Sequence, residues 1–178
     1  MKSYVFDASA LFSFLQEKPG ARKVNELLKD AIRGRAEILM SAVNFGEVYG
    51  AVLREHGRER ARSIMNAVQP LPITLVDATP QRAFLAAEVK VKYKLYSVDS
   101  FAAALALEHK ATLVTSDSDF RRLGHSFPTL SACGGSDVIQ KTASKPLIAP
   151  NEYGHLRPTL RPRLRIREFH HRLLWLKA

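Results

Sequence analysis

The sequence predicts a three-layer α/β fold, in which helices cover both faces of a parallel sheet. Two observations lead to this prediction. Short apolar segments of strand length alternate with longer segments whose apolar residues recur at helical spacing. Turn residues, helix caps and polar residues separate these segments along the chain. Such alternation is typical of parallel sheets, because each crossover between parallel strands needs room for a helix.

Five short segments have the composition of buried strands. They are residues 4–6, 37–40, 73–76, 112–115 and 128–130. The first is the most informative, because its aromatic and apolar residues end abruptly in a carboxylate, Asp7. A turn of small residues and a helix-like run follow at once.

Helices are predicted between these strands from apolar spacing and from capping residues. They cover residues 10–15, 21–34, 42–56, 58–68, 79–93 and 98–109. Ser41 is expected to cap the third helix, and Gly57 is expected to end it. Thr79 and Pro80 have the N-cap and first-turn pattern, and Ser97 is expected to cap the last helix.

Charge and composition divide the chain in two. The net charge is +10, and residues 131–178 supply +6 of it, with nine basic and three acidic side chains. We expect residues 1–130 to form one domain, and residues 131–178 to be a basic, Pro- and Arg-rich extension that is poorly ordered or loosely docked. The alternative is that this extension is a basic arm for nucleic acid.

The sequence has no feature of a secreted or membrane protein. Its single cysteine, Cys133, excludes an intramolecular disulfide and fits a reducing compartment. Asp7 interrupts the apolar run near the N-terminus, which is too short for a signal peptide. No segment approaches the about 20 apolar residues of a membrane-spanning helix. We therefore expect a cytoplasmic protein with no membrane partner.

Four carboxylates are predicted to lie near the carboxyl-terminal edge of the sheet. Asp7 ends the first strand and Asp117 follows the fourth. Glu47 lies in the second turn of the helix after the second strand, and Asp99 in the first turn of the helix before the fourth. In open α/β sheets, ligands bind in the crevice outside this edge. The sequence thus predicts a site built from distant acids.

Each acid also has a structural explanation. Asp7 could cap a helix or form a turn. Glu47 could be a solvated helix residue, and Asp99 could interact with the helix dipole. Asp117 or Asp119 could cap the short helix that follows them.

Taken together, the acids favour a metal site. Two like charges about 4 Å apart repel by about 4 kcal/mol at an effective dielectric near 20. Carboxylates that share a pocket must therefore take up protons or recruit cations. Ligation by oxygen without Cys or His suits Mg²⁺ or Mn²⁺, and the matching chemistry is phosphodiester hydrolysis by activated water.

Four motifs together resemble those of the PIN-domain ribonucleases, and within them the VapC-type toxins of prokaryotic toxin–antitoxin pairs. They are VFDASA (5–10), SAVNFGEV (41–48), SVDSFAAA (97–104) and LVTSDSDF (113–120). The resemblance covers residues 1 to about 130; the extension departs from the family pattern. It implies a five-stranded parallel sheet, cleavage of RNA with Mg²⁺ or Mn²⁺, a homodimer, and inhibition by a small antitoxin whose tail enters the active-site groove.

The resemblance also implies roles for individual residues. The catalytic set that it implies is Asp7, Glu47, Asp99, Asp117, Ser9 and Thr115. The first three match the core acidic triad and the fourth a more variable acid, while the two hydroxyls match positions that orient the acids or water. Asp119 matches a substitute for Asp117 or a neighbour that supports it, so the expected metal ligands are the four acids and Asp119.

The expected mechanism is in-line attack of a metal-activated water near Asp7 and Asp99, which leaves a 5′-phosphate and a 3′-hydroxyl and needs no histidine base. RNA is expected to reach the acids across a rim of basic residues, since phosphate contacts supply most non-specific affinity. The candidates for this rim are Arg54, Arg58, Arg60, Arg62, Lys90, Lys92, Lys94, Arg121 and Arg122.

Three other functions stay open. A DNA- or structure-selective nuclease would use the same metal site, which does not distinguish the sugars. A non-catalytic binding module would use the acids as caps and the basic extension as its working part. A small-molecule phosphohydrolase is disfavoured, because the sequence has no glycine-rich phosphate loop.

Overall fold

The structure is a computed structural model that describes residues 1–125 and 127–132. Its five strands form one sheet in the order β3-β2-β1-β4-β5, and every pair of neighbours is parallel. The strands are β1 (Lys2–Phe6), β2 (Ala36–Ser41), β3 (Thr74–Val76), β4 (Thr112–Thr115) and β5 (Thr129–Ser131). The predicted fold class is therefore confirmed.

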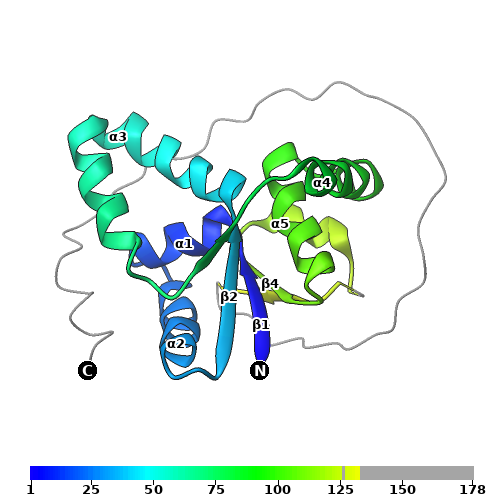
Figure 1. Ribbon diagram of the computed structural model, residues 1–178, viewed down its shortest axis with the longest axis horizontal. Coiled ribbons are helices and arrows are strands. Elements are labelled where there is room, and N and C mark those ends of the chain that lie inside the picture. Colours follow the sequence, from blue (N-terminus) through cyan, green and yellow to red (C-terminus); the bar gives the residue numbers. More distant parts are fainter. Residues whose placement is uncertain (126, 133–178) are drawn as a thin grey trace.

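Helices cover both faces of the sheet (Figure 1). They are α1 (Ala8–Leu15), α2 (Ala21–Ile32), α3 (Ala42–Val68), α4 (Pro80–Tyr93), α5 (Ser97–Glu108) and the 3₁₀ helix η1 (Ser118–Leu123). The helices α1, α2 and α3 lie on one side of the strands, while α4 and α5 lie on the other (Figure 1). Among the helices of residues 1–125 and 127–132, none combines the length and apolar character needed to cross a bilayer.

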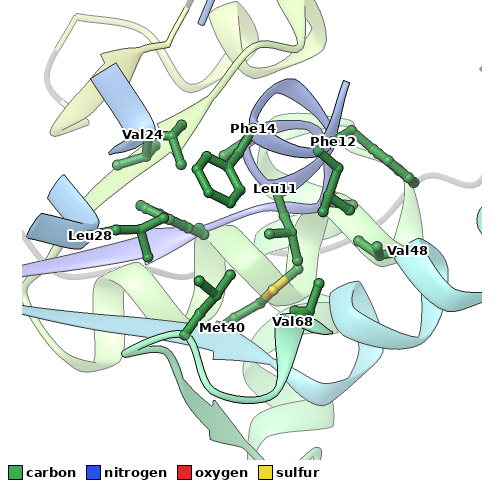
Figure 2. Close-up of a cluster of buried hydrophobic side chains, with 14 of the residues drawn as sticks. Leu11, Phe12, Phe14, Val24, Leu28, Met40, Val48 and Val68 are labelled. Atoms are coloured by element: carbon green, nitrogen blue, oxygen red, sulfur yellow. The ribbon is translucent and has the colours of Figure 1, made fainter. Parts of the chain in front are cut away.

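Each face of the sheet has its own hydrophobic core, because successive strand residues point to opposite sides. Phe6 belongs to the core under α1, α2 and α3, whereas Val5 belongs to the core under α4 and α5. Figure 2 shows the first core, where side chains of the three helices meet Met40 of β2. Both Val5 and Phe6 have no exposed surface, so β1 lies at the centre of the fold.

The strand order creates a topological switch point between β1 and β4. From β1 the chain builds outward through β2 to β3, then returns to place β4 on the other side of β1 and β5 beyond it. The connections on the two sides of the β1–β4 crevice therefore run in opposite directions. A crevice of this kind, at the carboxyl ends of the strands, is where open α/β sheets bind ligands.

Two local predictions are corrected. The helices expected at 42–56 and 58–68 are two arms of α3, joined by a kink at Gly57, whose φ of 74° lies in the left-handed region. The chain resumes the helix beyond Gly57 because Ala61 and Ile64 still pack into the first core. The cap of α5 is Tyr96 and not Ser97, because Tyr96 has the extended backbone of an N-cap and Ser97 is already the first residue of the helix. The Ser97 hydroxyl accepts a 2.8 Å hydrogen bond from Lys90 Nζ.

Other predictions about caps and ends are confirmed or shifted slightly. The side chains of Ser41 and Thr79 cap α3 and α4 as expected. The strand expected at 128–130 lies one residue later, and buried Ala132 still belongs to the first core. The predictions for Cys133 and for the rest of the extension lie outside the described residues.

Candidate functional site

Asp7 lies at the switch point itself. Parallel pairing sets Phe6 of β1 beside Val114 of β4, and the Asp7 backbone N–H donates to the Val114 carbonyl at 3.2 Å. The next residue of β4, Thr115, therefore lies beside Asp7 at the carboxyl-terminal edge. The side chain of Asp7 is almost wholly buried, with 2% of the residue exposed.

The carboxylate of Asp7 is held by hydrogen bonds from both strands. Thr115 Oγ1 donates to Oδ2 at 2.9 Å, and Ser9 Oγ lies 2.9 Å from each carboxylate oxygen. The N–H of Ala10 donates to Oδ1 at 2.8 Å, so Asp7 is also the N-cap of α1. Asp7 is therefore a helix cap and, at the same time, part of the hydrogen-bonded group at the edge of the sheet.

Two backbone N–H groups of the loop after β4 support the hydroxyls in turn. The N–H of Ser116 donates to Ser9 Oγ at 2.8 Å, and the N–H of Asp117 donates to Thr115 Oγ1 at 2.9 Å. Each hydroxyl accepts one of these bonds and donates its own hydrogen to the site. The loops after β1 and β4 are therefore tied into one network around the Asp7 carboxylate.

Burial raises the pKa of Asp7 from its ordinary value of 3.8 to about 7. The hydrogen bonds from Ala10, Ser9 and Thr115 lower this pKa, and the negative charge of Asp117 raises it. Near neutral pH, the Asp7 carboxyl is thus divided between its charged and neutral forms. A cation bound beside it would favour the charged form and release the proton.

Asp117 and Asp119 belong to the short helix after β4. Asp117 Oδ1 accepts a hydrogen bond of 2.9 Å from the Asp119 N–H, so Asp117 caps η1 as well as acting on the pKa of Asp7. Asp119 Oδ1 lies 3.8 Å from Nη2 of Arg122 in a half-exposed ion pair. Of these two acids, Asp117 is the one with an electrostatic link to Asp7.

Glu47 and Asp99 are carried by two helices that pack against each other, α3 and α5. Asp99 is buried, with 4% of the residue exposed, in the first turn of α5, and Glu47 is half-buried in the second turn of α3. A hydrogen bond of 3.2 Å from Asn44 Nδ2 to the Val98 carbonyl joins the two helices next to these acids.

Sequence reasoning did not single out Asn44 or Ser116. Asn44 gave one usable signal, because it is a polar residue one turn before Val48 on the apolar stripe of its helix. Ser116 gave none, since its backbone N–H bonds Ser9 and its hydroxyl lies 2.7 Å from that of Ser13, and both partners are more than 100 positions earlier in the chain.

The donors suit a hard cation, although they do not form a finished coordination sphere. Within residues 1–125 and 127–132, no three side chains of His, Cys, Asp or Glu lie close enough to share a metal ion. Asp7 and Asp117 interact, and the helices of Glu47 and Asp99 are joined, but the five expected ligands are not drawn together around one point. The chemistry of the residues nevertheless fits Mg²⁺ or Mn²⁺, since all of them offer oxygen ligands. Burial raises the pKa of Asp7, and a bound cation would lower it again by stabilising the charged carboxylate.

All nine residues of the expected basic rim are exposed, on α3, on α4 and the residue after it, and on η1. Four of them make contacts around the start of α5. Lys90 contacts Ser97, Lys92 Nζ lies 5.0 Å from the centre of the Tyr93 ring, and Arg122 Nη1 donates to the Lys94 carbonyl at 2.8 Å. The clusters on α4 and η1 are therefore joined to each other.

Solved toxin–antitoxin proteins have the same fold. VapBC from Salmonella typhimurium bound to DNA matches with a TM-score of 0.58 and 15% identity, over 75% of this chain and 100% of that chain. VapBC2 from Rickettsia felis bound to a promoter DNA fragment matches with a TM-score of 0.57 and 17% identity, over 72% and 98%. VapC20 from Mycobacterium tuberculosis, a Sarcin-Ricin loop cleaving toxin, matches with a TM-score of 0.54 and 16% identity, over 68% and 95%.

At these identities the likeness concerns the fold. No curated protein matches the sequence. The family model of the PIN domain matches residues 4–126, which includes the last three residues of β1, the strands β2 to β4, all the helices and all five expected acids. The chain therefore belongs to the PIN-domain family.

Proposed function

We propose that the protein is an Mg²⁺- or Mn²⁺-dependent endoribonuclease that acts as the toxin of a type II toxin–antitoxin pair. The observation that carries this proposal is the buried Asp7 at the switch point, with its raised pKa and its hydrogen bonds to Ser9 and Thr115. A carboxyl that is held this firmly but is only partly ionised is poised to bind a cation. Membership of the PIN-domain family supports nuclease activity in general.

Asp7, Glu47, Asp99 and Asp117 would hold the cation, with Asp119 as a further candidate. When bound, Mg²⁺ or Mn²⁺ supplies charge neutralisation at the scissile phosphate and lowers the pKa of a water molecule.

The chain's own side chains prepare the site for this chemistry. Ser9 and Thr115 fix the direction of the Asp7 carboxylate, because their hydroxyls are themselves fixed by backbone N–H groups of the loop after β4. Asp7, whose pKa burial raises, would give up its proton to hold a cation. The basic rim would attract the RNA backbone toward acids that would otherwise repel it.

The proposed partners are RNA, a small antitoxin and a second copy of the chain, in the cytoplasm. Support for an antitoxin comes from the kind of assembly seen among proteins of this fold. These include a toxin–antitoxin complex from Klebsiella pneumoniae, with a TM-score of 0.52 and 18% identity over 72% of this chain and 97% of that chain.

Cleavage assays on matched RNA and DNA strands test the proposal. The full chain should cut RNA with Mn²⁺ or Mg²⁺, and EDTA should abolish the activity. Asp7→Asn should lose cleavage, whereas Asp30→Asn should retain it, because Asp30 lies on the surface near the end of α2.

Three results would contradict the proposal in different ways. Full metal-dependent cleavage by Asp7→Asn would remove Asp7 from the mechanism. Cleavage of DNA but not RNA would replace the ribonuclease by a DNA nuclease. RNA binding without cleavage would favour the non-catalytic binding module.

A further inference from the structure

Asn44 is a polar side chain in a fully buried position, with 0% of the residue exposed. It lies in the first turn of α3, where this helix meets α5. Its Nδ2 donates to the Val98 carbonyl at 3.2 Å. Its Oδ1 is also buried and has no hydrogen-bond partner among the residues that the structure describes.

Stability does not account for an amide at this position. A neutral hydrogen bond adds little to net stability, because folding exchanges it for a bond to water. A buried acceptor without a donor costs at least as much as one such bond adds. The Val98 carbonyl lies in the first turn of α5 and accepts a helical bond there in any case. An apolar side chain of similar shape would therefore stabilise the α3–α5 contact at least as well as Asn44.

The place of the hydrogen bond suggests another role. Glu47 follows Asn44 by three residues, which puts it about one turn farther along the same side of α3. On the other helix, Asp99 follows Val98 directly. The Asn44–Val98 bond thus joins the two helices within one turn of both acids, between residues 54 positions apart in the chain.

We infer that Asn44 is a positioning residue, which sets α3 against α5 so that Glu47 and Asp99 can hold the same cation. The inference rests on the proposed function. Oxygen ligands of Mg²⁺ must meet distances of about 2.0–2.1 Å in near-octahedral geometry. A small slip between two packed helices would break such a geometry, and one directed hydrogen bond at their contact prevents it. Apolar packing alone does not fix the helices in this way, because it is not directional.

The test compares Asn44→Leu with Val52→Ala. Leucine has the branching of asparagine but cannot donate to the Val98 carbonyl. Val52 is a fully buried residue two turns farther along α3, in the core shared with α1 and α2, so its truncation weakens packing without touching this bond. Mn²⁺ binding is measured by electron paramagnetic resonance on the full chain without RNA. Urea unfolding and RNA cleavage are measured on the same samples.

Asn44→Leu is expected to keep the urea midpoint of the wild type, or to raise it, while its Mn²⁺ affinity falls about tenfold or more, as for residues that orient metal ligands. Val52→Ala is expected to lower the urea midpoint and to keep the Mn²⁺ affinity. If leucine does not fit, the smaller Asn44→Ala provides the same comparison.

Two outcomes would overturn the inference and leave the proposed function intact. One is a Mn²⁺ affinity for both Asn44 variants within about twofold of the wild type, well short of the usual loss. The other is an equal loss of affinity in Val52→Ala, which would make it an effect of general packing. If the wild type binds no Mn²⁺ and cuts no RNA, the proposed function itself is wrong.

Discussion

Replacing Asp7 by asparagine is expected to stabilise the protein in the absence of divalent cations, although it should abolish cleavage. Burial raises the pKa of Asp7 from 3.8 to about 7, so the folded state binds a proton that the unfolded chain has released. This shift corresponds to about 4 kcal/mol of destabilisation at a pH above 7. Asparagine has no charge and so avoids this cost.

Some of that gain is offset by lost hydrogen bonds. The Oδ1 of asparagine can still accept the Ala10 N–H, but its NH₂ group cannot accept from Ser9 and Thr115. Each such bond contributes about 1 kcal/mol. We therefore expect the free energy of unfolding of Asp7→Asn to exceed that of the wild type by about 2–4 kcal/mol at pH 8.

The pH dependence identifies the cause. Below about pH 4, both states bind the proton, and the Asp7 carboxyl costs nothing. As the pH rises from about 4 to about 7, the free energy of unfolding of the wild type falls by about 1.4 kcal/mol per pH unit, and above about pH 7 it falls no further from this cause. The advantage of Asp7→Asn over the wild type should therefore grow up to about pH 7 and then stay constant.

Urea unfolding in EDTA, at pH values from 5 to 8, measures this difference. Asp30→Asn serves as a control for the removal of a surface carboxylate. Added Mn²⁺ should stabilise the wild type but not Asp7→Asn, because a ligand that binds only the folded state raises its stability. A difference between wild type and Asp7→Asn that does not change with pH would refute the reasoning from burial.

Three further predictions concern one hydrogen bond and two glycines of α3. Thr115→Val removes the hydroxyl that donates to Asp7, so the pKa of Asp7 should rise further and cleavage at neutral pH should fall by about tenfold; an unchanged pH–rate profile would contradict this. Gly50→Ala should stabilise α3 by about 0.5–1 kcal/mol, since a Cβ there meets nothing within 4 Å. Gly57→Ala should destabilise it by about 1 kcal/mol, because its φ is +74°; equal urea midpoints for the two variants would show that the kink carries no strain.

Local patterns predicted the strands and helices well, because burial and capping depend on nearby residues. The abrupt end of β1 at Asp7 and the caps Ser41 and Thr79 are examples. Ser97 shows the limit of such reasoning, since the helix begins one residue earlier than its capping residue type suggests and makes Ser97 the first helical residue. Gly57 is a similar case, because core contacts farther along continue the helix past a typical stop signal.

The site was only partly predictable. Its chemistry could be read from Asp7 and the other acids, but its geometry depends on which strands become neighbours. That Thr115 donates to Asp7 follows from the placement of β4 beside β1, which no local pattern specifies. Asn44 was missed for the same reason, because its hydrogen-bond partner, the Val98 carbonyl, lies on α5, 54 positions away in the chain.

The placement of β4 beside β1 also governs when activity can begin. Asp7 and Thr115 are separated by 108 positions, and every strand and helix from α1 to α5 lies between them. A nascent chain that has emerged only as far as α5 has its first acid, but it lacks the Thr115 hydroxyl and the loop N–H groups that complete the network around it. On the proposed function, a toxin built in this way stays harmless throughout most of its own synthesis, and a truncation before β4 yields an inert fragment.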